Sequence, residues 1–515
     1  MFTARTHSTL SSLATRSATR RGFATLRPLF NSDRKAPSEA TSSLPAKESI
    51  EKAGTEILDK LGSRSAGKVV ATSGIVDPGS GRSTLSPLPP NDRRSVGTTG
   101  LALPHGKVFT VRPIKSWIDK IASEHGSPGS HFTGSSPQPA KNYQKRDLVL
   151  KTMQDSYTEI ILPFKSDKTL LEEYINVGGT LRHGKIMEDL DALAGAISYK
   201  HADDGKPDSS PLTIVTASVD RIDLLKPLVV NDIRLSGHVS YVGFSSMEIF
   251  MKMEEIPAGK PEQHGDTILV ARFTMVARDA LTSKAAQVNP MFLRNEAEKK
   301  LFQMGENHKA RKRLATDASL TKRPPTQDER FLIHDLYLEY SEYDNPDTKT
   351  KKPENVEWMS DTKLSAFHIM QPQDRNVHDK IFGGYLMRLA YELAFSNASV
   401  FISSRPTFLA LDDISFRKPV SIGTFLALDS QVVYAEGGDS QSFQVMVKAD
   451  VLDVKKKTRE TTNTFWFTFT NPVKGTPRIM PRTYAESMLY IEGQRRRRLG
   501  TQMADISRKN HGQQE

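Results

Sequence analysis

The stretch NVGGTLRHGKIMEDLDALAG (Asn176–Gly195) recurs in altered form 200 positions later as NVHDKIFGGYLMRLAYELAF (Asn376–Phe395). The two stretches align without a gap, and the alignment places Asp191 of the first on Tyr391 of the second. Each begins with an asparagine and continues into a run whose apolar residues recur every three or four positions, the spacing of a buried helical face. The chain therefore contains two copies of a segment that leads from a polar loop into a core-facing helix.

The similarity between the two copies continues downstream in the same order. ASVDRIDLLKPLVV (Ala217–Val230) matches LALDDISFRKPVSI (Leu409–Ile422), which places Pro227 on Pro419. Two strand-like pairs follow: HVSYV matches QVVYA, and ARFTMVA matches FWFTFTN. Four ordered segments that stay within a drift of eight residues indicate a duplicated domain.

Each copy reads as an apolar strand, a polar loop, a helix and four further strands. The strand prediction rests on alternation, as in the run of apolar residues at Met247, Ile249, Met251 and Met253. One helix followed by a meander of antiparallel strands can bury its apolar stripe if the sheet curls around it. We therefore expect an α+β fold with two tandem domains, each an antiparallel sheet wrapped around a central helix.

The rest of the chain falls into segments of different composition. Residues 1–32 contain five arginines and no acid, the composition of an organelle-targeting presequence. Ser, Pro and Gly dominate the next segment, which favours disorder or a linker. The expected organisation is a presequence at 1–32, a linker at 33–106, a first domain at 107–285, a helical connector at 286–327, a second domain at 328–480 and a charged C-terminal tail at 481–515.

Composition excludes several kinds of site. The absence of cysteine removes disulfides, thiolate metal sites and cysteine nucleophiles. No apolar run approaches the roughly 20 residues needed to cross a bilayer, so no transmembrane segment is expected. The net charge of +11 is not gathered into one cluster, which argues against a nucleic-acid partner. Neither a P-loop nor a Gly-x-Ser-x-Gly turn is present.

The repeated segment itself brings together groups suited to acyl transfer to water. A helix start offers unpaired N–H groups that can polarise a carbonyl oxygen, and a glycine such as Gly184 lets a ligand approach. A carboxylate two turns along, Asp191, can act as general base or as nucleophile. An asparagine such as Asn176 can orient water or hold the substrate. This chemistry needs no metal.

The pattern Asn-x6-Gly-Gly-x6-Asp, followed by D-x-I-x-x-x-K-P, resembles the hotdog-fold acyl-CoA thioesterases. The tandem copies, the presequence-like N-terminus and the segments KIFGGYLMRLAYELA and TYAESMLYIEG are similar to the mitochondrial double-hotdog members of that family. The resemblance covers roughly 108–493 and implies hydrolysis of acyl-CoA to a carboxylic acid and coenzyme A, without a cofactor, in the mitochondrial matrix. It also implies a homo-oligomer and suggests a trimer.

The resemblance further implies an active site at the contact between two hotdog units, with the asparagine and the acid from different units. The first composite site then joins Asn376 to Asp191, with the backbone N–H groups of His183 and Gly184 near the thioester carbonyl. His183 replaces the first glycine of the usual pair and is an alternative base. We expect this site to be the competent one.

The second composite site joins Asn176 to the start of the other helix at Gly384, but its acid position holds Tyr391. The neighbouring Glu392 is about 100° out of phase on the helix and need not reach the site. The sequence therefore predicts one competent and one degenerate site per chain.

Two further questions stay open at the level of sequence. The basic residues beside the repeated prolines can either meet the phosphates of coenzyme A or remain solvated: Lys226, Arg417 and Lys418. The alternative to an enzyme is a non-catalytic hotdog protein that binds acyl-CoA or serves as an assembly subunit. A hotdog dehydratase is disfavoured because no HFPG-type segment occurs.

Overall fold

The computed structural model describes residues 143–206, 209–257, 263–345, 347, 350–374, 380–473 and 475–511. All of them lie in one compact unit, Ile50–Glu515. The expected presequence at 1–32, the expected linker at 33–106 and the predicted site residue Asn376 lie outside the described residues.

The first copy has the predicted order of one strand, one central helix and four further strands. Its antiparallel strands lie side by side in the order β1-β3-β4-β5-β2. The elements are α3 (Met153–Ser156), β1 (Thr158–Leu162), α4 (Lys168–Tyr174), α5 (His183–Ala202), β2 (Leu212–Leu224), β3 (Ile233–Val242), β4 (Ser246–Glu255) and β5 (Thr267–Asp279).

The second copy repeats this arrangement, with antiparallel strands in the order β7-β10-β11-β12-β8. A small parallel pair of β6 and β13 lies outside the main sheet. The elements are β6 (Val356–Trp358), η1 (Met359–Thr362), β7 (Leu364–Ile369), η2 (Pro372–Asp374), α8 (Gly383–Ile402), β8 (Thr407–Leu411), β9 (Ile414–Ser415), β10 (Phe425–Ala435), β11 (Ser442–Asp453), β12 (Thr458–Thr470) and β13 (Arg478–Met480).

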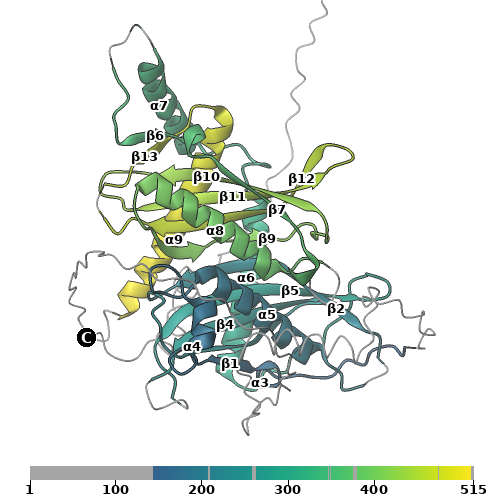
Figure 1. The fold of residues 1–515 in the computed structure, drawn as a ribbon. Helices are drawn as coiled ribbons and strands as arrows, with labels where there is room; N and C mark the ends of the chain where they lie inside the picture. The colour runs from purple at the N-terminus through teal and green to yellow at the C-terminus, as the bar shows by residue number, and fades with distance from the viewer. Residues whose placement is uncertain are drawn as a thin grey trace, which may run out of the picture. The chain divides into compact units, whose positions relative to one another are not determined.

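The two sheets join edge to edge into one sheet of eleven strands (Figure 1). At the junction β2 pairs antiparallel with β8, placing Ile222 opposite Leu411, and β9 also pairs with β2. An ion pair crosses the junction from Arg221 Nη1 to Asp412 Oδ1 at 2.7 Å, and both side chains are largely buried. The duplication has therefore produced a single continuous sheet rather than two separate domains.

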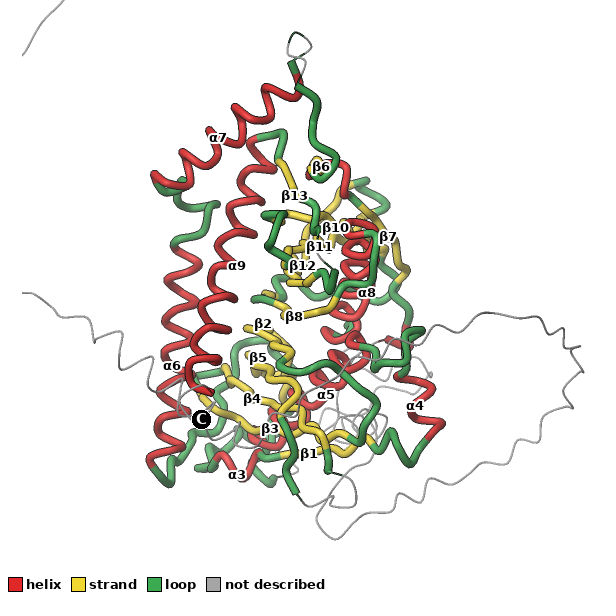
Figure 2. Tube along the Cα trace, turned by 90° about the vertical axis from the view of Figure 1, so that its left-hand side faces the viewer, coloured by secondary structure: helices red, strands yellow, loops and turns green. Residues whose placement is uncertain are grey.

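Helices cover both faces of this sheet, as Figure 2 shows. The central helices α5 and α8 lie on one face, and α6 (Glu296–Asp317) and α9 (Tyr484–His511) lie on the other. The predicted apolar stripe of α5 is buried, because Ile186, Leu190 and Leu193 are at most 1% exposed. Buried side chains of both copies form one continuous core, so the hotdog architecture is confirmed in a fused form.

The segments around the two copies are more structured than the sequence indicated. The connector contains α6 and is followed by α7 (Gln327–Asp344), whose start has a capping box of Thr326 and Glu329. The predicted C-terminal tail is instead the long helix α9. Arg495 of α9 makes two contacts of 2.7 Å with the Glu329 carboxylate, and Arg496 lies over the Trp466 ring at 4.6 Å.

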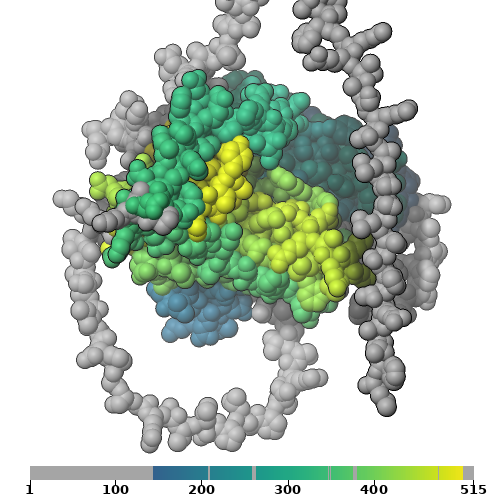
Figure 3. Space-filling view, turned by 90° about the horizontal axis from the view of Figure 1, so that it is seen from above, coloured from purple at the N-terminus to yellow at the C-terminus, as the bar shows by residue number. Residues whose placement is uncertain are grey.

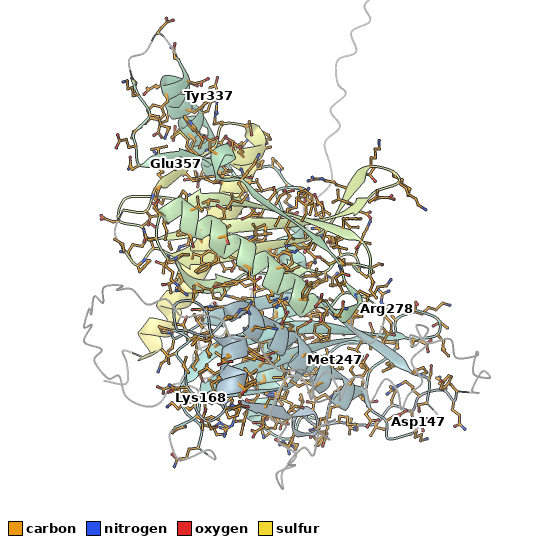
Figure 4. The ribbon with its side chains drawn as sticks, in the orientation of Figure 1. Asp147, Lys168, Met247, Arg278, Tyr337 and Glu357 are labelled. Atoms are coloured by element: carbon orange, nitrogen blue, oxygen red, sulfur yellow. The ribbon has the colours of Figure 1, made fainter. Side chains whose placement is uncertain are left out.

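The views of the surface agree with these contacts. In the space-filling view of Figure 3 the yellow C-terminal helix lies beside the green segment that contains α7. In Figure 4 Tyr337 is labelled on α7, where its side chain is exposed, and Met247 on β4, where it is fully buried. Within the part of the chain that the structure describes, no helix is long and apolar enough to span a membrane.

Candidate active site

The helices α5 and α8 pass each other in opposite directions, so that the N-terminal half of each contacts the N-terminal half of the other. The contacts exchange equivalent positions: Gly184 lies against Arg388, and Gly384 lies against Glu188. Because positions 188 and 388 correspond in the two copies, the helix pair has an approximate two-fold axis. The start of each helix therefore meets the acid position of the other.

Glycine is needed at both of these crossing points. A Cβ atom on Gly384 would lie 2.8 Å from the backbone Cα of Glu188. A Cβ atom on Gly184 would lie 2.7 Å from the side-chain Cγ of Arg388. Since real Cβ atoms do not approach other atoms this closely, the paired glycines of the sequence pattern set the separation of the two helices.

Asp191 is the acidic group at the crossing, and its side chain is almost fully buried, with 3% of the residue exposed. Its Oδ2 accepts a hydrogen bond of 2.6 Å from the N–H of Gly384, the second residue of α8. Its Oδ1 accepts one of 2.7 Å from the hydroxyl of Thr216 on β2. The carboxylate from the first copy therefore lies at the positive, N-terminal end of a helix from the second copy.

Burial raises the pKa of Asp191 to about 6, and the negative charge of Glu188 acts in the same direction. The hydrogen bonds from Thr216 and Gly384 oppose this change because they stabilise the ionised form. At neutral or slightly alkaline pH the group is ionised, yet it is a stronger base than an ordinary aspartate. This combination suits a general base or a nucleophile.

The structure does not bring His183 and Gly184 to Asp191, as the sequence analysis expected. They begin the same helix eight positions earlier, roughly 12 Å along its axis. The helix start beside Asp191 is Gly383–Gly384, and a Cβ atom on Gly383 would lie 3.1 Å from Asp191 Oδ2. Gly384, which had been assigned to the second site, therefore lies in the first, because the two helices cross in opposite directions.

The second crossing point is lined by aromatic side chains. The ring of His183 stacks on that of Tyr391, with centroids 5.4 Å apart, and meets the edge of Phe408 at the same distance. Burial lowers the pKa of His183 to about 4, with the positive charge of Arg405 acting in the same direction, so the ring is neutral. Burial also raises the pKa of Tyr391, which keeps its hydroxyl protonated.

The remaining residues assigned to the second site serve local structure. Asn176 Oδ1 accepts hydrogen bonds from the N–H of Gly178 at 2.8 Å and from Arg405 at 2.9 Å. Glu392 is exposed and forms an ion pair with Arg182 at 2.9 Å. The asparagine therefore orders its own loop and links the two copies, and the glutamate lies at the surface.

Asn376 lies outside the described residues, but the chain on either side of it is described. The N–H of Phe382, the residue before Gly383, donates a 3.1 Å hydrogen bond to the carbonyl of Asp374. On the other side, Lys380 forms a bridge to Ser421. The segment that contains Asn376 therefore starts and finishes near the helix start that meets Asp191.

The three basic residues considered for coenzyme A binding are all exposed. Lys226 forms an ion pair with Asp266 at 2.6 Å, and Lys418 forms one with Glu460. Arg417 follows Phe416, whose ring would be 3.4 Å from a Cβ atom on Gly383. Of the three, Arg417 is thus nearest in sequence to a residue that contacts the Asp191 site.

Sequence reasoning missed Thr216 and the role of Gly383. The repeat contained a signal for the former, since extending the matched segment by one residue places Thr216 on Phe408. Two hydrogen-bonding side chains of the first site, Asp191 and Thr216, thus correspond to two aromatic side chains of the second. Among the described residues no group of three or more metal-binding side chains occurs.

Comparison with known proteins gives close relatives by sequence. A bovine (Bos taurus) protein named acyl-coenzyme A thioesterase 9, mitochondrial, is 43% identical over 398 residues, which cover 75% of this chain and 89% of that protein. The human (Homo sapiens) protein of the same name is 42% identical over 354 residues, covering 68% of this chain and 78% of that protein. No protein-family model matches the chain.

Solved structures with a similar fold include an acyl-CoA hydrolase from Staphylococcus aureus in complex with butyryl coenzyme A, coenzyme A and coenzyme A disulfide. It is 23% identical and covers 31% of this chain and 99% of its own, with a TM-score of 0.28. An acyl-ACP thioesterase from Bacteroides thetaiotaomicron is 12% identical and covers 62% of this chain and 99% of its own, with a TM-score of 0.37. The family assignment rests on the sequence relatives, which match both copies. The chain belongs to the family of the mitochondrial acyl-coenzyme A thioesterases.

Proposed function

We propose that this chain hydrolyses acyl-CoA thioesters to a free carboxylic acid and coenzyme A, at the crossing of α5 and α8. The observation that carries the proposal is the 2.6 Å hydrogen bond from the Gly384 N–H to the Asp191 carboxylate, which joins a base from one copy to a helix start from the other. The membership of the thioesterase family supports the same reaction.

In this proposal the thioester carbonyl oxygen lies at the start of α8, where the N–H groups of Gly383 and Gly384 stabilise the oxyanion. Asp191 acts on the carbonyl carbon, either directly or by taking a proton from the attacking water. Collapse of the tetrahedral intermediate breaks the carbon–sulfur bond, and the coenzyme A thiolate leaves and is protonated. Asn376 from the second copy orients the water or the thioester.

The relatives and the composition support three further parts of the proposal. The enzyme acts in mitochondria, most plausibly in the matrix, and needs no cofactor beyond the coenzyme A of its substrate. It forms a homo-oligomer, for which a trimer is the specific proposal. Sedimentation velocity of the purified chain tests the last point, because a single species of monomer mass would contradict it.

The central test compares two acid-to-amide variants, Asp191→Asn and Glu392→Gln, for release of coenzyme A from acyl-CoA substrates of increasing chain length. We expect Asp191→Asn to lower kcat by at least about a thousandfold, since both roles of the carboxylate are lost. Glu392→Gln should hydrolyse at the wild-type rate because Glu392 is exposed and pairs with Arg182. A wild-type chain that binds acyl-CoA without turnover would instead favour the non-catalytic alternative.

A further inference from the structure

The ion pair between Glu188 and Arg388 occupies the crossing of α5 and α8 immediately beside the Asp191 site. Glu188 Oε1 lies 3.0 Å from Arg388 Nε, and both side chains are only 19% exposed. The two residues are equivalent positions of the two copies, so the pair lies close to the approximate two-fold axis. The ion pair thus joins the helix that carries the acid to the helix that carries the oxyanion site.

The backbone of Glu188 is also part of the contact that positions Gly384. A Cβ atom on Gly384 would lie 2.8 Å from Glu188 Cα, 3.3 Å from its carbonyl oxygen and 3.0 Å from Asp191 Cβ. Glu188 precedes Asp191 by one helical turn, so their side chains lie on neighbouring parts of the same face. A change at Glu188 or Arg388 therefore reaches both the helix separation and the charge near Asp191.

We propose that Glu188 and Arg388 are a positioning pair for the hydrolysis, a role that rests on the proposed function of Asp191. The pair holds the start of α8 against α5, so that the Gly384 N–H stays on Asp191, and Arg388 neutralises the carboxylate nearest to the catalytic one. Neither side chain is assigned contact with the substrate.

The charges that surround Asp191 come from three elements. On α5, Lys185 Nζ lies 3.0 Å from Glu188 Oε2 and is a second cation on the same carboxylate. On α8, the Arg388 guanidinium lies over the Tyr385 ring at 5.0 Å. On β7, burial lowers the pKa of His368, and the charge of Arg388 acts in the same direction. Arg388 is thus the buried cation through which all of these groups connect.

The proposal predicts opposite changes for the two partners. In Arg388→Gln the charge of Glu188 is less compensated, so Asp191 ionises at higher pH and the acid limb of the kcat/KM profile should move up by about one pH unit. In Glu188→Gln the repulsion is removed, and the acid limb should move down. The double variant should return close to the wild-type position because both charges are absent.

The test is the pH profile of kcat/KM for the full chain and these three variants, with Arg182→Gln as the matched control. Arg182 also pairs with a glutamate of the other copy, at 2.9 Å, but its partner Glu392 is exposed and one position past Tyr391. We expect the control to leave the acid limb in place. Unmoved limbs in both single variants, or limbs that move in the same direction, would overturn the proposal.

Failure of the underlying function gives a different result. If Asp191→Asn hydrolyses acyl-CoA at the wild-type rate, the proposed function fails whatever the profiles show. If Asp191→Asn is inactive and the limbs do not move, only the positioning pair fails. Should Arg388→Gln not fold, Glu188→Gln still decides the sign of the change.

Discussion

At the scale of single residues, Asp191 combines near-complete burial with two hydrogen bonds that favour its charge. Thr216 supplies one of them, so Thr216→Val should raise the pKa of Asp191 further above about 6. We expect the acid limb of kcat/KM to move to higher pH and the rate at pH 7 to fall roughly tenfold, with partial recovery at pH 9. The measurement is the rate of acyl-CoA hydrolysis between pH 5 and 9.

Thr274→Val is the matched control for this prediction. Its hydroxyl also donates to an aspartate, Asp220 Oδ2 at 3.1 Å, on β2 but away from the helix crossing. The control should leave the profile unchanged. A profile for Thr216→Val that keeps the wild-type limb would show that the hydroxyl does not tune Asp191.

The raised pKa of Asp191 also has a cost in stability. Between its ordinary value of 3.8 and about 6 the folded state binds the proton more tightly than the unfolded state, so the free energy of unfolding falls as pH rises through this window. Above pH 6 the loss amounts to about 3 kcal/mol at most. Asp191→Asn should therefore be more stable than wild type at pH 8 and lose this advantage below about pH 4.

Denaturant unfolding of both proteins at pH 8 and pH 4 measures this difference. The asparagine can still accept from the Gly384 N–H and donate to Thr216, so its packing is preserved. An Asp191→Asn variant that is less stable than wild type at pH 8 would mean that the two hydrogen bonds outweigh the burial of the charge. Asp191 was predicted from the sequence, whereas its stabilising partner Thr216 was not, because it lies outside the helix motif.

At the scale of the elements, the crossing of α5 and α8 depends on the two equivalent glycines in unequal ways. Gly384→Ala would place its Cβ 2.8 Å from backbone atoms of Glu188, which cannot rotate away. Gly184→Ala would meet the flexible stem of Arg388 at 2.7 Å, which can move. We expect Gly384→Ala to lower kcat by at least about a hundredfold and Gly184→Ala by much less, because only the former displaces the N–H from Asp191.

Steady-state kinetics with thermal unfolding of both variants tests this prediction. Equal losses of kcat in the two alanine variants would contradict the assignment of the oxyanion site to α8. The helices and strands themselves were predictable from periodicity, as in the buried stripe of α5. Their crossing was not, because periodicity shows which face is buried but not which element of the other copy meets it. That gap explains why His183 and Gly184 were expected beside Asp191.

At the scale of the whole molecule, duplication has produced one continuous sheet with two unequal crossing points. The sequence indicated the repeat and the lost acid at Tyr391. It did not indicate that β2 and β8 would pair, or that the charged C-terminal segment would form α9 against the sheet. Pairing between edges and packing of a polar helix depend on contacts between distant residues, such as Arg221 with Asp412 and Arg495 with Glu329.

The unequal crossing points lead to a prediction about reversing the loss. Tyr391→Asp would restore the acid, but its neighbours are the rings of His183 and Phe408, and Phe408 stands where the first site has Thr216. A carboxylate there lacks the threonine hydroxyl and is buried among aromatic side chains, which should destabilise the fold by about 3 kcal/mol or more. We therefore expect Tyr391→Asp to unfold at a lower temperature and to gain no activity, including in an Asp191→Asn background, whereas Tyr391→Phe should retain wild-type kcat and stability. Thermal unfolding and coenzyme A release on the three variants measure this. Hydrolysis recovered by Tyr391→Asp in the Asp191→Asn background would show that the second crossing lacks only its acid.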